Sequence, residues 1–159
     1  MARRRREADA GGTRSHPAGV DGRDTATPAP AKGRVTPGLT FDTGALIALE
    51  RRRFRMAKVF GNAVADGTPI TVPTVVVAEW WRGRSQAREV ILRGVRVDET
   101  PLATARLAGE AIASVPGASV VDAIVMASAA QRGDVVYTSD PEDLERLRAV
   151  FPAVRVLRV

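Results

Sequence analysis

The sequence has no cysteine and a single histidine, His16. The lack of cysteine excludes disulfides, thiolate metal sites and thiol nucleophiles, and it suits a reducing compartment such as the cytoplasm. No apolar run approaches the roughly 18 residues that a membrane-spanning helix needs. The arginines at the N-terminus are not followed by the apolar segment of a secretory signal. We therefore expect a cytoplasmic protein without a membrane segment, and we assign His16 no role.

Residues 1–38 also lack leucine, isoleucine and phenylalanine, while ten of them are glycine or proline. Such a composition buries too little apolar surface to offset the entropy of ordering, so we predict a disordered extension. This extension has eight Lys or Arg and four Asp or Glu, a net charge of +4, which leaves +2 for residues 39–159. The run Arg3 to Arg6 suits a polyanion, although a solubilising tail is the more usual role of a charge block.

Residues 39–159 are rich in valine, alanine, leucine and isoleucine. The spacing of these apolar residues alternates between that of strands and that of helices. Short apolar runs predict strands at 39–41, 70–72, 95–97, 135–137 and 154–159. Apolar residues at helical spacing lie between these runs. Strands separated by helices indicate βαβ units. We therefore predict one α/β domain, a three-layer α/β/α sandwich around a mostly parallel sheet of four or five strands.

Four acids follow or interrupt apolar segments: Asp42, Glu79, Asp122 and Asp140. A carboxylate near a core requires hydrogen bonds, a cation or a metal as compensation. Asp42 alone is equally well explained as a helix N-cap. Four such acids, with few Lys or Arg in similar apolar surroundings, instead suggest a shared cation. Because residues 39–159 contain no histidine, oxygen ligation favours Mg²⁺ or Mn²⁺ over Zn²⁺.

The same acids stand in short motifs whose order along the chain is informative. The motifs are Asp42-Thr43 after the first predicted strand, Glu79 followed by Arg82-Gly83, Asp122 at the start of an alanine-rich helix, and Thr138-Ser139-Asp140 after the fourth strand, with Asp143 just beyond. In this order and spacing they resemble the PIN-domain ribonucleases, in particular the toxins of VapBC-type toxin–antitoxin pairs. The resemblance covers nearly all of residues 39–159.

The resemblance implies a metal-dependent endoribonuclease that acts as the toxin of a type II toxin–antitoxin system. It implies that Asp42, Glu79, Asp122 and Asp140 are the catalytic and metal-binding residues. It also implies an RNA substrate, a cognate antitoxin that covers the acids with a basic side chain, and a homodimer. A divalent ion held by carboxylates would supply the nucleophilic water and the counter-charge that phosphodiester hydrolysis needs.

Three further residues are candidates for the same site. Thr43 and Thr138 are placed to orient a carboxylate or a metal-bound water, with ordinary turn or cap bonding as the competing explanation. Asp143 either contributes to the site or is a first-turn acid favoured by the helix dipole.

Arginines and tryptophans suggest contacts with partners. Arg51, Arg82 and Arg84 are candidates for RNA phosphate contacts, a geometry that suits arginine, while solvation at the surface is the default for each one. Trp80 and Trp81 suit base stacking, but one buried ring and one ring at a dimer or antitoxin interface is the favoured interpretation.

Other enzymes with an acid after the first strand fit the sequence less well. A haloacid dehalogenase-type phosphatase needs a second aspartate two residues after the first, where this chain has Gly44. A response-regulator receiver needs an acidic pair there and a lysine after a late strand, where Asp140 stands instead. The remaining alternative is a catalytically silent PIN-like module that binds RNA or protein.

Overall fold

A computed structural model describes residues 37–159, so the predicted extension at residues 1–38 lies almost entirely outside the described residues. The strands are β1 (Leu39–Phe41), β2 (Ile70–Pro73), β3 (Arg96–Asp98), β4 (Val135–Thr138) and β5 (Arg155–Arg158). They form one sheet in the order β3-β2-β1-β4-β5, and each neighbouring pair is parallel. The predicted parallel sheet is thus confirmed, with β5 at an edge.

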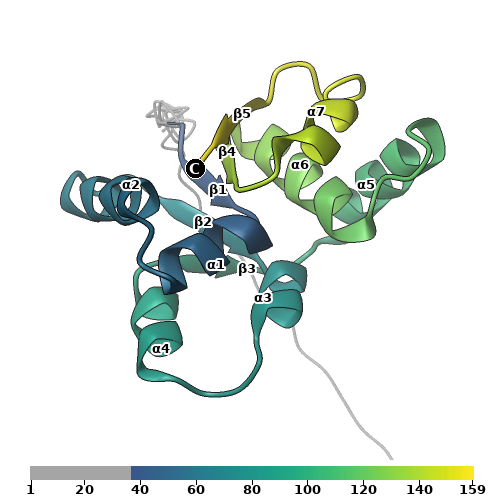
Figure 1. The fold of residues 1–159 in the computed structure, drawn as a ribbon. Coiled ribbons are helices and arrows are strands. Elements are labelled where there is room, and N and C mark those ends of the chain that lie inside the picture. The colour runs from purple at the N-terminus through teal and green to yellow at the C-terminus, as the bar shows by residue number, and fades with distance from the viewer. Residues whose placement is uncertain (1–36) are drawn as a thin grey trace, which may run out of the picture. The chain divides into compact units, whose positions relative to one another are not determined.

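Helices connect every strand to the next. They are α1 (Thr43–Glu50), α2 (Phe54–Ala65), α3 (Thr74–Trp80), α4 (Gln86–Arg93), α5 (Leu102–Ser114), α6 (Val120–Arg132) and α7 (Pro141–Leu147). Figure 1 shows α1, α2 and α4 on one side of the sheet and α5, α6 and α7 on the other, which gives the three predicted layers. Among the helices of residues 37–159, none has the length and apolar character needed to span a membrane.

The strand order reverses at β1. The chain moves from β1 through β2 to β3 at one edge, and then returns across the sheet to β4 on the other side of β1. In open α/β sheets, ligands bind at the carboxyl ends of the strands where the connections diverge in this way. The two strands meet closely there, because the Asp42 N–H donates to the Tyr137 carbonyl at 3.3 Å. The residues that follow β1 and β4 are therefore held side by side.

Alanine-rich α6 is the central helix of the core. Every residue from Ala123 to Ala129 is buried, and the helix packs on β1, β2 and β4. Small side chains allow this close approach to the sheet and to α5. Ser119 caps its N-terminus by accepting the Asp122 N–H at 3.0 Å, as expected from the sequence. The packing of α6 fixes the position of Asp122 in its first turn.

A buried ion network ties the end of α6 to the sheet. Asp134 is only 5% exposed, and its carboxylate accepts the Arg132 Nε at 2.9 Å, the Thr40 hydroxyl at 2.8 Å and the Gly38 N–H at 2.9 Å. Arg132 also pairs with Asp98 at 2.7 Å. Asp134 was absent from the acids predicted to need compensation. Its cation is supplied by the chain itself, which distinguishes it from the four acids singled out by the sequence.

We expect Arg132→Ala to lower the free energy of unfolding by about 3–5 kcal/mol, because it leaves the buried Asp134 carboxylate without its cation. Urea denaturation measures the change. Arg148→Ala is the matched control, since Arg148 pairs with Glu145 at 2.9 Å with both side chains well exposed. Such a surface pair contributes about 0–1 kcal/mol. Equal losses in the two variants would contradict a structural role for the Arg132 network.

Candidate active site

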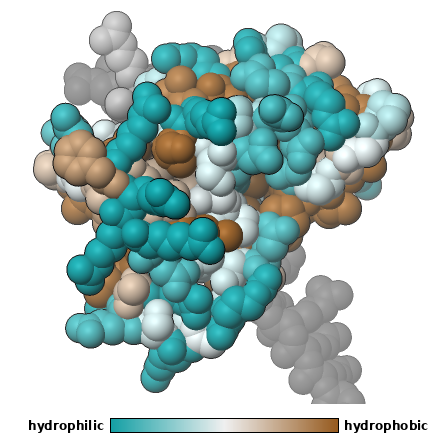
Figure 2. All heavy atoms as spheres, in the orientation of Figure 1, coloured by the Kyte–Doolittle hydropathy of each residue, from teal (hydrophilic) through white to brown (hydrophobic). Residues whose placement is uncertain are grey.

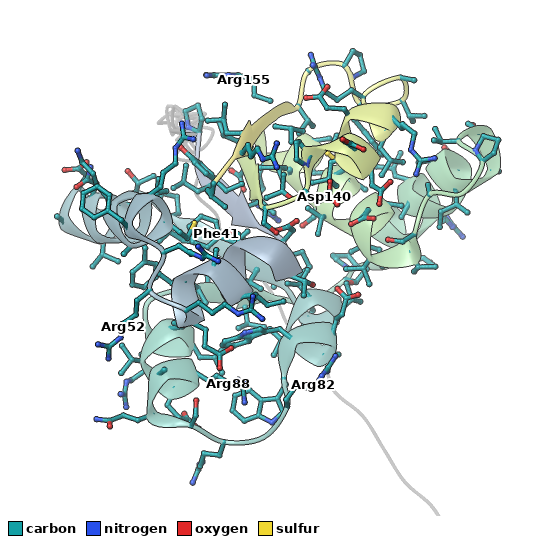
Figure 3. All side chains as sticks on the ribbon, in the orientation of Figure 1. Phe41, Arg52, Arg82, Arg88, Asp140 and Arg155 are labelled. Atoms are coloured by element: carbon teal, nitrogen blue, oxygen red, sulfur yellow. The ribbon has the colours of Figure 1, made fainter. Side chains whose placement is uncertain are left out.

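The four predicted acids lie on the helices that follow β1, β2 and β4 and at the start of α6. Asp42 is the N-cap of α1, Asp122 lies in the first turn of α6, and Asp140 is the N-cap of α7. Glu79 is the penultimate residue of α3, the helix that directly follows β2. Figure 3 shows Asp140 where α7 begins, on the side facing α1 and α6. The fold thus brings together acids that are separated by up to 98 positions in the chain.

The surroundings of the four acids differ, although apolar residues flank each of them in the sequence. Asp42 is buried and Asp122 is half-buried, but Glu79 and Asp140 are exposed. Helix α3 buries Val76 and Trp80 and turns Glu79 outward. Asp140 ends an extended segment at the surface and accepts the Glu142 N–H at 3.4 Å. The apolar neighbours in the sequence therefore belong to other faces of these elements.

Asp42 is a strongly perturbed acid. Its side chain is 8% exposed, and burial raises its pKa to about 6. Hydrogen bonds from the Thr138 side chain and from the Ala45 N–H, at 2.6 Å, act in the opposite direction. The negative charges of Asp122 and Glu79 raise the pKa further. Asp42 is therefore both a helix cap and a carboxylate that lacks a compensating cation.

Asp122 is the electrostatic centre of the group. Burial raises its pKa, while the Ser119 hydroxyl, which donates to Oδ2 at 2.6 Å, lowers it. The charges of Asp143, Glu79 and Asp140 each raise it. Charges on α3 and at α7 thus raise the pKa of Asp122, and the charge of Asp122 raises the pKa of Asp42. These mutual effects place Asp143 in the same electrostatic group, although that residue itself pairs with Arg146 at 2.7 Å.

The two predicted threonines hold acids and backbone in place. The Thr43 hydroxyl donates to Glu79 Oε2, which links α1 to α3. Thr138 Oγ1 accepts the Asp140 N–H at 2.9 Å and donates to the Asp140 carbonyl at 3.0 Å. The same Thr138 side chain also lowers the pKa of Asp42. Thr138 therefore combines turn bonding with a contact to the buried acid, so the two explanations offered by the sequence are compatible.

Gly44 permits a contact that sequence reasoning missed. A Cβ atom at this position would lie 2.2 Å from Ser139 Oγ and 3.1 Å from the Ser139 backbone nitrogen. The first distance is too short for any real contact and the second is unusually tight, so a side chain at position 44 would displace the Ser139 turn, whereas glycine lets the start of α1 lie against it. This contact brings the Asp42 and Asp140 segments together.

The acids lack cations in the described part of the chain. None of Asp42, Glu79, Asp122 and Asp140 takes part in the ion pairs formed within residues 37–159. Carboxylate oxygens are the ligands that Mg²⁺ and Mn²⁺ prefer. However, no three Asp, Glu, His or Cys side chains in these residues are arranged closely enough to hold one ion as they stand. The donor chemistry fits a hard divalent cation, but binding requires the carboxylates to converge.

The predicted partner-binding residues fall in different places. Arg51 and Arg82 line a groove of about 650 Å³ together with Thr43 and Glu79. Arg84 does not line this groove, and it pairs with Glu89 at 3.0 Å. The three arginines predicted to contact RNA are thus divided between two locations.

The tryptophans also divide. Trp80 is 3% exposed and donates its indole N–H to Glu50 at 2.9 Å, so it belongs to the core as predicted and is not free to stack on a base. Trp81 is partly exposed and lines a shallow apolar groove with Leu92 and Val97. Its predicted role at a dimer or antitoxin interface stays a prediction.

Comparisons with known proteins identify the fold. No protein-family profile matches the sequence, and no curated protein matches it significantly. The structure is similar to a chain of DNA-bound VapBC from Salmonella typhimurium, with a TM-score of 0.63, 16% identity, and coverage of 77% of this chain and 98% of that one. Similarity also extends to VapBC2 from Rickettsia felis bound to a promoter DNA fragment, with a TM-score of 0.62, 11% identity, and coverage of 76% and 98%.

A toxin–antitoxin complex from Klebsiella pneumoniae contains a third similar chain, with a TM-score of 0.59, 18% identity, and coverage of 77% of this chain and 100% of that one. Almost the whole length of each of these chains is matched, so this protein shares their complete fold. The α/β fold expected from the resemblance is therefore confirmed.

We expect Asp42 to make the metal-free fold less stable as the pH rises. Its pKa is about 6 in the folded chain against an ordinary 3.8, so its stabilising contribution is fully present below about pH 4 and is lost as the pH passes 6. This shift corresponds to about 3 kcal/mol. Asp42→Asn keeps the acceptor for the Ala45 N–H. It should match the wild type near pH 4 and exceed it by up to about 3 kcal/mol at pH 7.

Urea denaturation in EDTA across this pH range measures the difference. Asp66→Asn, at an exposed position after α2, controls for the loss of one surface carboxylate. A gap between Asp42→Asn and the wild type that stays constant with pH would contradict the raised pKa of Asp42.

Proposed function

We propose that this protein is a metal-dependent endoribonuclease and the toxin of a type II toxin–antitoxin pair. One observation carries the proposal: the charges of Glu79 and Asp140 raise the pKa of Asp122, the charge of Asp122 raises that of Asp42, and none of these four acids has an ion-pair partner within residues 37–159. By contrast, the buried Asp134 is paired with Arg132. A group of acids that act on one another, include the buried Asp42 and lack cations is suited to binding one from solution.

The four acids are the residues that would hold Mg²⁺ or Mn²⁺. Such an ion supplies a nucleophilic water and a counter-charge for the phosphodiester. The chain's own hydroxyls orient the acids for this purpose: Thr43 holds Glu79, Ser119 holds Asp122, and Thr138 contacts Asp42. Glu79 and Asp140 are exposed, so their side chains have room to exchange the hydrogen bonds with Thr43 and with the Glu142 N–H for a position closer to Asp42 and Asp122.

A partner protein is part of the proposal. The similar chains come from structures described as VapBC or as a toxin–antitoxin complex. By analogy, we propose that a cognate antitoxin covers the acids of this chain and places a basic side chain among them. Such a contact is physically favourable, because a cation brought to unpaired carboxylates relieves their mutual repulsion.

The alternative is a catalytically silent module of the same fold that binds RNA or protein. The loose arrangement of the acids favours this alternative, since no three of them form a ready ligand set in the described residues. The two functions differ in one property. An enzyme needs the acids to bind a metal, whereas a silent module needs them only for stability or not at all.

We expect Asp122→Asn to abolish RNA cleavage and to weaken stabilisation by Mn²⁺. In the wild type the melting temperature should rise with Mn²⁺ concentration, because a ligand that binds only the folded state stabilises it by mass action. Without metal, the variant should be at least as stable as the wild type, because it removes one repelling charge at the centre of the group. Thermal melts with and without Mn²⁺, together with cleavage of total RNA in Mn²⁺ or EDTA, measure these effects.

Glu145→Gln is the control for this experiment, because Glu145 is exposed and paired with Arg148. It should preserve both cleavage and the Mn²⁺ response. If Asp122→Asn destabilises the metal-free protein and leaves the Mn²⁺ response intact, Asp122 is a structural acid. Absence of cleavage by the wild type, with an intact fold, would favour the silent module.

A further inference from the structure

The groove that contains Arg51 and Arg82 begins at the acid group. Thr43 and Glu79, which are hydrogen-bonded to each other, belong both to the candidate active site and to the wall of this groove. From Thr43 the groove follows one face of α1 through Ile47 to Arg51. Eight residues of helix span about 12 Å. Arg51 therefore lies too far along α1 to act at the reacting phosphate, but it is placed to contact a neighbouring one.

Charges of both signs line the groove. Glu50 is already neutralised: its carboxylate accepts the Trp80 indole N–H at 2.9 Å and pairs with Arg88 at 2.8 Å. Glu79 is hydrogen-bonded to Thr43. Arg51 and Arg82 are exposed and form no ion pair within residues 37–159. These two guanidinium groups are the groove's available positive charges.

The Arg88 side chain holds the groove in shape. It extends from α4, donates to the Gly83 carbonyl at 2.9 Å, pairs with Glu50 on α1, and lies 5.8 Å from the centre of the Trp80 ring. These contacts fasten the loop after α3, which carries Arg82, to the end of α1, which carries Arg51. Figure 3 shows Arg82 and Arg88 on the same side of the molecule, below α1. A band of hydrophilic side chains covers this face in Figure 2.

We propose that this groove is a subsite for single-stranded RNA, in which Arg51 and Arg82 bind a phosphate that flanks the reacting one. The proposal rests on the proposed function, since it places the reacting phosphate at the acids. A volume of about 650 Å³ lies within the usual range of about 300–1,000 Å³ for ligand sites. The groove binds phosphate rather than base edges, so it gives affinity without sequence preference. Arg84, although predicted to contact RNA, lies outside the subsite.

The test compares Arg51 and Arg82, which line the groove, with Arg84, which is two positions from Arg82 but does not line it. Binding of a fluorescein-labelled single-stranded RNA of mixed sequence is measured by anisotropy over a series of KCl concentrations. The full chain is used in the Asp122→Asn background, so that the RNA remains intact and the N-terminal extension is the same in every variant. Arg51→Ala and Arg82→Ala should each weaken binding about fivefold, as expected for one exposed charge-assisted contact. Because both arginines contact the same phosphate, the Arg51→Ala/Arg82→Ala double variant should reduce the salt slope by about 0.7, the value for one phosphate of a single strand.

Arg84→Ala is the matched control, because it removes the same side chain two positions beyond Arg82 from an exposed pair with Glu89. It should leave the affinity and the salt slope unchanged. If the three variants behave alike, or if Arg51→Ala and Arg82→Ala leave RNA binding unchanged, the subsite is wrong. A loss confined to binding of an antitoxin peptide would also overturn it.

Failure of the proposed function has a different signature. If the wild type cuts no RNA in Mn²⁺ while Arg82→Ala still weakens RNA binding and Arg84→Ala does not, the subsite stands as part of an RNA-binding module and the nuclease function is wrong. A wild-type chain that cuts RNA without showing this difference retains the nuclease function and loses the subsite.

Discussion

Burial and mutual repulsion of carboxylates that have no cation within residues 37–159 form the constraint on which the candidate site depends. Burial raises the pKa of Asp42 and of Asp122, and neighbouring negative charges raise both further, so the metal-free site opposes folding near neutral pH. The fold partly offsets this repulsion. Asp42, Asp122 and Asp140 all lie at helix N-termini, where backbone N–H groups and the helix dipole favour negative charge. An added cation would remove the remainder.

The topology explains why the acids meet. Strands β1 and β4 are neighbours although about 95 residues separate them, and the helices that leave their carboxyl ends diverge. Helix α6 returns to this edge and presents its first turn there, while glycine at position 44 lets α1 contact the turn at Ser139. Each acid therefore comes from a different element, and the packed core determines their spacing. Mutations in this core should act on the site indirectly.

Much of the fold and of the site was predictable from the sequence because both follow local patterns. Short apolar runs predicted all five strands, and the helical spacing of the residues between them predicted the helices. Asp42, Asp122 and Asp140 were indicated by their positions after a strand or at a helix start, and Glu79 by the apolar run before it. Burial was not predictable, because it depends on which face of a short helix meets the core. Glu79 faces outward although its neighbour Trp80 is buried.

Contacts between segments that are distant in the sequence were also not predictable from it. Arg132 and Asp134 stand two positions apart in the sequence, but their burial depends on β1, which contributes Thr40. Arg82 and Arg84 look equivalent in the sequence. They differ because Arg88 fastens the Gly83 carbonyl and directs the course of the loop. Such distinctions require the tertiary structure.

The most direct measurement is the anomalous scattering of Mn²⁺ in crystals of the protein soaked in MnCl₂. If the acids share a cation, a peak should lie among the carboxylates of Asp42, Glu79 and Asp122, with Glu79 rotated toward the other two. An ordered structure at saturating Mn²⁺ without a peak at this edge of the sheet would contradict the account.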